Sequence, residues 1–227
     1  IAYHLWLLRE TVRRPAKTVI GVNAINRRFW VQSMMEDPIK NGVLSVQTLR
    51  NNIMASTVLA STAITLSSLI AVVTTSNKGD RTTMLVVIGD RSDTSFTIKF
   101  FCIIVCFLVA FLLTVQSIRF YSHASMLINV PVKKLPSVGN RLTTEYVVQC
   151  VNKGGYFWSL GLRAFYFSCP VFLWIFGPIP MFTCCVLMVM VLYFLDFNYA
   201  SGWVVSQCSG SHRTGVDEEV MSKTRSK

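Results

Sequence analysis

The chain has 227 residues, of which 52% are apolar and 15% are charged, and its formal net charge is +11. Soluble domains usually carry charge on about a quarter of their residues, so this composition argues against an ordinary soluble protein. The positive charge could indicate nucleic-acid binding. The basic residues, however, are spread over loops beside apolar stretches rather than gathered in one basic module, so no nucleic-acid partner is expected.

Long apolar stretches predict an all-α fold, a polytopic bundle of transmembrane helices. About 20 apolar residues are needed to cross a hydrocarbon core of about 30 Å, and residues 49–75 and 98–118 meet that requirement. Residues 158–197 are too long for one span, and Gly177-Pro178-Ile179-Pro180 interrupts them. We therefore predict two spans, 158–176 and 181–197, joined by a turn; one kinked span after an interfacial segment is the alternative.

The chain opens on the apolar residues 1–8, which are too short to cross a membrane. We expect them to be the end of a truncated first span, which gives four or five spans within a transmembrane domain of residues 1–200. A cleaved signal peptide is the competing interpretation, but Arg9, Arg13 and Arg14 follow instead of a small-residue cleavage site. Residues 201–227 are polar and predict a disordered tail.

Basic residues predict the orientation, because loops rich in Lys and Arg face the cytoplasm. Residues 9–50 and 119–158 are such loops, whereas residues 76–99 are nearly balanced in charge. Within the first loop, apolar residues of Gly21–Met35 recur at helical spacing. They predict an amphipathic cytoplasmic helix that either lies on the membrane or packs on neighbouring helix ends.

Three arginines are candidate contacts for membrane lipids or an anion. Arg27 and Arg28 lie in the amphipathic segment, where attraction to anionic lipids would bring about 1 kcal/mol per basic residue. Arg163 lies inside a predicted span, where it can either extend to the cytoplasmic interface or bind an anion or a lipid phosphate.

The span at residues 49–75 carries two stripes of small or polar side chains. Asn52, Ser56, Ala60, Ala63, Ser67 and Ala71 form the first, and Thr57, Ser61, Thr65 and Ser68 form the second. Small residues let membrane helices approach closely, which favours tight packing. Alternatively the hydroxyls line a hydrated path, with Arg50 and Asn51 at its cytoplasmic mouth. One chain has little room for an internal channel, so this hypothesis requires a homo-oligomer.

Signatures of an enzyme are lacking in the sequence. Its seven cysteines and three histidines show no zinc or redox spacing, and no glycine-rich phosphate loop is present. We therefore expect no enzymatic activity, no metal and no cofactor.

Several segments resemble the plant branch of a family called domain of unknown function five-ninety-nine. They are Tyr3–Leu8, Asn26-Arg27-Arg28 with Trp30, Asp37-Pro38, Lys40–Leu44, Gln47–Thr57, Leu59–Ile64, Gly155–Ala164 and Trp174–Met181. The resemblance extends from residue 1 to about residue 197. It implies a membrane protein of plant origin and supports the truncated first span, but it implies no mechanism.

The expected function is that of an oligomeric channel or transport protein whose second helix lines the path. The alternative is a membrane scaffold or lipid-binding adaptor without transport activity. Either would be a multi-pass protein of the plasma membrane or an endomembrane, with lipids and further copies of the chain as partners.

Overall fold

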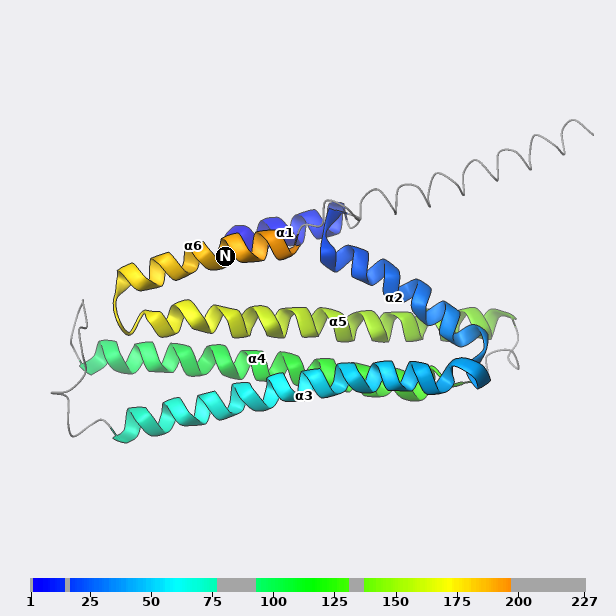
Figure 1. Cartoon of the computed structure of the whole chain (residues 1–227), viewed down its shortest axis with the longest axis horizontal. Helices are drawn as coiled ribbons and strands as arrows, with labels where there is room; N and C mark the ends of the chain where they lie inside the picture. The colour runs from blue at the N-terminus through cyan, green and yellow to red at the C-terminus, as the bar shows by residue number, and fades with distance from the viewer. Residues whose placement is uncertain (1, 15–16, 77–92, 131–136, 197–227) are drawn as a thin grey trace, which may run out of the picture. The chain divides into compact units, whose positions relative to one another are not determined.

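The computed structural model describes residues 2–14, 17–76, 93–130 and 137–196. Within these ranges all long elements are α-helices and there is no β-sheet, which confirms the all-α prediction. The helices are α1 (Ala2–Arg13), α2 (Val19–Glu36), α3 (Pro38–Ser76), α4 (Asp93–Leu127), α5 (Ser137–Leu173) and α6 (Pro178–Asp196) (Figure 1). The predicted tail, residues 201–227, lies outside the described residues.

Three of the described helices are long and apolar enough to cross a membrane. Their apolar ranges are Pro38–Val72 in α3, Ser95–Leu127 in α4 and Pro178–Asp196 in α6. Helix α5 is not among these three; most of its polar and charged residues lie in its first half, and its second half carries Arg163. The structure thus supports a helical membrane protein, whereas the predicted number of four or five spans is not confirmed.

The chain divides into two compact units, which are described separately: residues 26–189, and the two chain ends, residues 1–25 with 190–227. In the unit of the chain ends, α1 lies alongside the last turns of α6. The rings of Trp6 and Tyr193 stack with their centroids 6.5 Å apart. The Tyr3 hydroxyl donates a hydrogen bond of 2.7 Å to the carboxylate of Asp196, which is buried.

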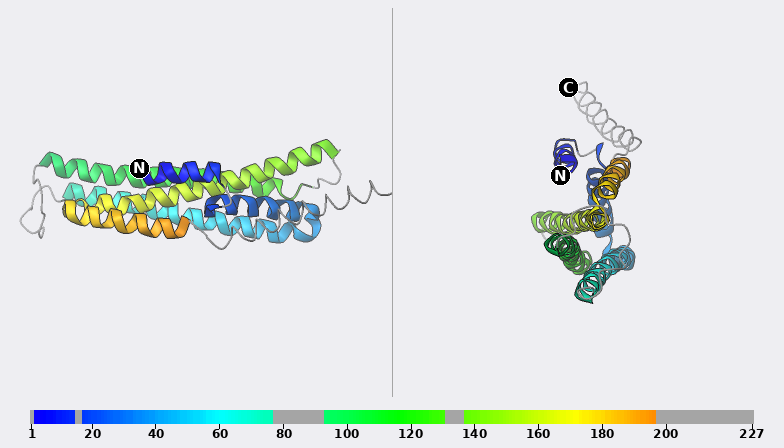
Figure 2. Two further views of the ribbon diagram at one scale, coloured as in Figure 1. Left: turned by 90° about the horizontal axis from the view of Figure 1, so that it is seen from above. Right: turned by 90° about the vertical axis from the view of Figure 1, so that its left-hand side faces the viewer.

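In the larger unit, α4 lies between α3 and α5 and packs along both (Figure 2). The three helices have 39, 35 and 37 residues, so each is about 50–60 Å long, nearly twice the thickness of a hydrocarbon core. Only part of each helix can therefore lie in lipid. On α4 the uncharged stretch between Lys99 and Arg119 is about 30 Å long, which matches that thickness.

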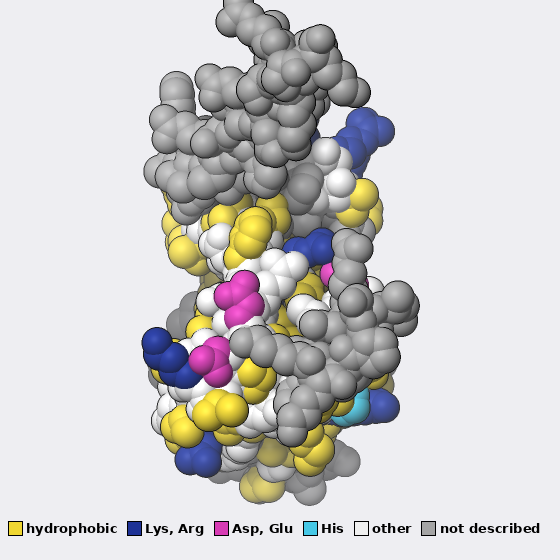
Figure 3. Space-filling model, turned by 90° about the vertical axis from the view of Figure 1, so that its right-hand side faces the viewer, with side chains coloured by type: hydrophobic (Ala, Val, Ile, Leu, Met, Phe, Trp, Pro, Cys, Tyr) yellow, Lys and Arg dark blue, Asp and Glu magenta, His cyan; other side chains and the backbone are white. Residues whose placement is uncertain are grey.

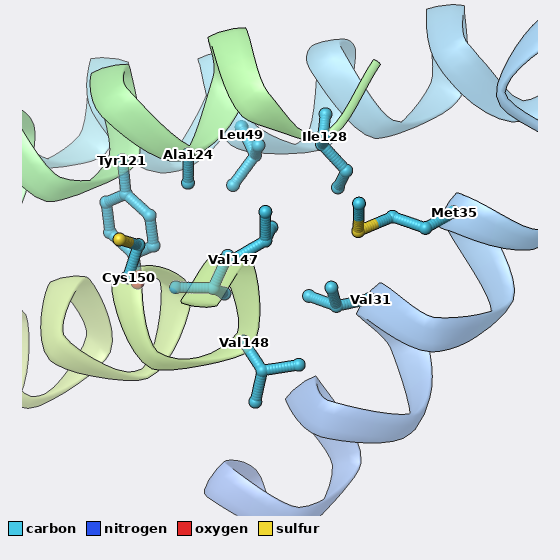
Figure 4. Close-up of a cluster of buried hydrophobic side chains, with 10 residues drawn as sticks. Val31, Met35, Leu49, Tyr121, Ala124, Ile128, Val147, Val148 and Cys150 are labelled. Atoms are coloured by element: carbon cyan, nitrogen blue, oxygen red, sulfur yellow. The ribbon is translucent and has the colours of Figure 1, made fainter. Parts of the chain in front are cut away.

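A four-helix core occupies one end of the larger unit, beyond Arg119. This core is formed by Val31 and Met35 of α2, Leu49 of α3 and two groups of residues from α4 and α5 (Figure 4). Those groups are Tyr121, Ala124 and Ile128 on α4, and Val147, Val148, Cys150 and Val151 on α5. We call this end of the unit the α2 end. A second core, with Ala63, Ile103, Phe107, Ala110 and Ile175, lies in the apolar part of the helices.

Helix α2 packs on neighbouring helices. This is the second of the two interpretations given above for Gly21–Met35. Val31 is fully buried and Met35 nearly so, while Arg28 and Phe29 remain exposed. The chain then turns at Asp37, whose carboxylate accepts a hydrogen bond of 3.3 Å from the backbone amide of Lys40. This cap, with Pro38 as first helical residue, explains why α3 begins there.

Small residues set the distance between α4 and α5. A Cβ atom added to Gly161 would lie 2.7 Å from the Cγ2 atom of Thr114, and one added to Gly154 would lie 2.9 Å from the Tyr121 ring. Thr114 cannot rotate away freely, because its hydroxyl donates to the carbonyl groups of Ala110 and Phe111. Any larger residue at Gly161 would therefore push the two helices apart.

The apolar region 158–197 is broken where the sequence predicts a turn. Helix α5 ends at Leu173, and α6 starts at Pro178. Gly177, just before α6, has a φ angle of 147°, a conformation that side chains disfavour. Proline lacks the amide that would continue α5, so the chain turns here.

We expect Gly161→Ala to lower the free energy of unfolding by about 1–3 kcal/mol, the usual cost of overpacking a tight contact. Thr114→Ser removes the methyl group that the new Cβ would meet, so the double variant should regain most of the lost stability. Thermal unfolding in detergent measures both effects, with Thr114→Ser alone as the control. A double variant no more stable than Gly161→Ala would contradict the close approach.

Candidate functional site

The two stripes of α3 have different surroundings in the structure. Ser56, Ala60, Ala63 and Ser67 of the first stripe are buried, on the side of α3 that faces α4. Asn52, which the sequence places in the same stripe, is exposed. Tight packing therefore describes most of the first stripe, and Asn52 is outside the packed contact.

The second stripe lies on the exposed side of α3. Thr57, Ser61, Thr65 and Ser68 are all exposed. Each hydroxyl donates a hydrogen bond of 2.8–2.9 Å to the backbone carbonyl four residues earlier. These hydroxyls are thus satisfied within their own helix, and we call this surface the hydroxyl face. Arg50 and Asn51, the predicted mouth, are exposed one to two turns before it.

Ser56 takes part in a polar contact across three helices. Its Oγ atom lies 3.5 Å from that of Ser117 on α4, and the Ser117 hydroxyl donates a 2.8 Å hydrogen bond to the Gly154 carbonyl on α5. Ser56, predicted as pore-lining or packing, is fully buried and belongs to this contact. The Ser56 hydroxyl itself donates to the Asn52 carbonyl of its own helix at 2.8 Å, so the hydrogen bond between helices here is the one from Ser117 to Gly154, which favours one register of α4 against α5.

Cations and aromatic rings alternate near Arg119, where the uncharged stretch of α4 ends. The Arg27 guanidinium lies 6.0 Å from the centre of the Tyr156 ring, and the Lys153 ammonium lies 5.8 Å from that of Phe120. Phe120 also stacks on Phe157 at 5.5 Å. Aromatic and basic side chains are enriched at the depth of lipid head groups. We call these residues, Arg27, Phe120, Lys153, Tyr156 and Phe157, the interfacial belt.

Arg27 reaches the belt through a notch in α5. A Cβ atom on Gly155 would overlap the Arg27 guanidinium, so only glycine leaves room for it. Burial raises the pKa of the Tyr121 hydroxyl on α4, and the nearby positive charge of Arg27 opposes that rise. Arg27 therefore connects α2 to both α4 and α5, and the sequence signal for its position is the glycine pair Gly154-Gly155.

The other two predicted arginines differ from Arg27. Arg28 donates to the Glu145 carboxylate at 2.9 Å, with both side chains about half exposed. Such a surface pair contributes at most about 1 kcal/mol and leaves Arg28 accessible. Arg163 is half-buried on α5, and its Nη1 atom is buried, so its side chain is not simply extended into solvent.

Two lysines were not predicted as site residues. Lys153 belongs to the belt, and Lys99 is buried at the start of α4. The residues around them could have signalled these positions, since Lys153 precedes the glycine pair and Lys99 follows Phe96 by one helical turn.

Cys150 is a packing residue of the core at the α2 end. Burial raises the pKa of the Cys150 thiol, which lowers its thiolate fraction and its nucleophilicity. Among the residues that the structure describes, no group of three His, Cys, Asp or Glu side chains is arranged to hold a metal ion.

Apolar helices, tight small-residue contacts and a belt of aromatic and basic side chains together define a helical integral membrane protein. The comparison with family models identifies it further. Residues 1–201 match the family described as "Protein of unknown function, DUF599", and the chain belongs to this family. No curated protein and no solved structure matches it.

Gly155→Ala should displace Arg27 from its notch and loosen α2, because the new methyl group would occupy the place of the guanidinium. Hydrogen exchange of the backbone amides of residues 26–36 should become faster. In an Arg27→Ala background the same glycine substitution should have little further effect, since the notch is then empty. An equal acceleration in both backgrounds would show that Gly155 does not act through Arg27.

Proposed function

We propose that the protein is a membrane scaffold that binds anionic lipid head groups at the interfacial belt and holds a folded helical platform at the cytoplasmic face. The observation that carries the proposal is the position of Arg27 and Lys153. Both cations lie over aromatic rings, on two different helices, where the uncharged stretch of α4 ends. Phosphate groups of lipids lie at this depth of a bilayer.

The extramembrane length of the helices supports this proposal. The four-helix core at the α2 end lies beyond Arg119 on α4, outside the stretch that matches the hydrocarbon core. Basic, acidic and apolar side chains lie together on the surface of this end (Figure 3). A mixed surface on a packed core is typical of a folded soluble module, which can bind a partner beside the membrane.

A scaffold requires no path through the protein. In a scaffold the small residues of α3 serve to pack helices together, and the structure places them in such a contact. Ser56, Ala60 and Ala63 pack against α4 within one chain. The hydroxyl face can also contact lipid without great cost, because its hydroxyls donate to the backbone of their own helix.

Replacing both Arg27 and Lys153 by Met should weaken the retention of phosphatidylserine by about thirtyfold, if each basic residue contributes about 1 kcal/mol. Native mass spectrometry of the purified protein counts the retained lipids, with phosphatidylcholine as the zwitterionic reference. Lys40→Met is the matched control, because Lys40 is exposed in the first turn of α3 and is not a residue of the belt. Unchanged retention in the double variant would refute lipid binding at the belt.

One observation favours the channel or transport function as a second candidate. The packed stripe accounts for the contact of α3 with α4, yet four hydroxyl-bearing residues remain on the exposed side of a helix long enough to cross a membrane. In a homo-oligomer, hydroxyl faces from several subunits could surround a hydrated path.

Under this second candidate, Ser61→Leu with Thr65→Leu should abolish ion flux through liposomes that contain the purified protein. Val58→Leu, an exposed apolar change on the same helix, should leave the flux intact. Flux that persists in the leucine variant, or a protein that is monomeric in nanodiscs, would exclude a path lined by α3.

A further inference from the structure

A buried lysine lies at the opposite end of α4 from the interfacial belt. Lys99 is only 6% exposed. Its ammonium group lies 5.5 Å from the centre of the Phe96 ring on α4 and 5.6 Å from that of Trp174, just after α5. Trp174 is held in place by the turn that ends α5, where its backbone amide donates to the Pro170 carbonyl at 3.0 Å.

This arrangement differs from that of a lysine that extends from a helix end into water. An exposed lysine keeps the full hydration shell of its ammonium, whereas the side chain of Lys99 is almost fully buried and its ammonium lies beside two aromatic rings. No ion pair or hydrogen bond joins Lys99 to another residue that the structure describes. Contacts with aromatic rings recover less free energy than removing an ammonium from water costs, so the site favours an additional anion.

The depth of Lys99 indicates the chemistry of that anion. Lys99 and Arg119 bound the uncharged stretch of α4, which is about as long as the hydrocarbon core is thick. Lys99 therefore lies at the head-group depth of the leaflet opposite the belt. Phosphate is the anionic group that all phospholipids carry at this depth, and lysine binds phosphate as a point charge.

We propose that Lys99, with Phe96 and Trp174, forms a binding site for a phosphate group. The phosphate belongs either to a phospholipid head group or to a small soluble phosphate. This site is separate from the interfacial belt and does not depend on the scaffold function.

The test compares phosphatidic acid with diacylglycerol, which has the same acyl chains without the phosphate, and with inorganic phosphate at constant ionic strength. Native mass spectrometry and the thermal unfolding midpoint of the full chain in detergent report binding. The wild-type protein should prefer phosphatidic acid over diacylglycerol, and Lys99→Met should weaken that binding at least about tenfold. Lys99→Arg should retain most of it. Arg119→Met, an exposed change at the other end of α4, is the matched control and should leave the Lys99-dependent binding unchanged.

The outcomes separate the two sources of phosphate. Stabilisation by phosphatidic acid alone assigns a lipid head group, whereas equal stabilisation by inorganic phosphate assigns a soluble ligand. Equal binding by the wild-type protein and Lys99→Met would overturn the proposal. If Lys99→Met does not fold, Lys99→Gln replaces it, because it removes the charge but keeps a polar side chain; the same weakening is expected.

Discussion

The close approach of α4 to its two neighbours is the constraint on which the larger unit depends. In lipid there is no hydrophobic drive between helices, so contact requires small residues and satisfied polar groups. Gly154 and Gly161 provide the room on α5, and Ser56 and Ala60 provide it on α3. The hydrogen bond from Ser117 to the Gly154 carbonyl then favours one register of α4 against α5, and Ser56 packs beside it. Both cores and the interfacial belt draw residues from α4 and α5, so they depend on this packing.

The same helices have one part of a length and composition suited to lipid and another part beyond it, and the residues that they bury and expose differ between the two. In the apolar part, α4 buries Ile103 and Ala110 and exposes Phe101 and Leu112, as lipid allows. At the α2 end, Tyr121, Ala124 and Ile128 are buried against α2, α3 and α5. Arg27 lies between these two regions, in the notch at Gly155 and beside the Tyr156 ring. The candidate lipid contact is therefore part of the packing between α2 and the bundle.

Apolar length and charge were enough to predict an all-α membrane protein, and Gly177-Pro178-Ile179-Pro180 marked the turn before α6. The sequence also separated the two stripes of α3, but it could not tell which one packs, because hydroxyls and small residues suit both environments. Asn52 shows this well, since its helical spacing placed it in the packed stripe and the structure exposes it. The sequence does not mark Lys99 and Lys153 as site residues, because their ring partners Trp174 and Phe120 are distant in the chain. The number of spans, the oligomeric state and the transported or bound molecule depend on contacts with lipid and other subunits, which local sequence patterns do not encode.

Helix α3 runs from Pro38 to Ser76 as one α-helix, from the α2 end to the far end of its apolar part. An unbroken ladder of backbone hydrogen bonds resists twisting, so the helix turns about its axis as a single rod. Leu49, held in the core at the α2 end, and Ser61, on the hydroxyl face, are attached to that same rod. A rearrangement of the core at the α2 end would thus also change which side chains of α3 meet the lipid, with no ligand entering the membrane.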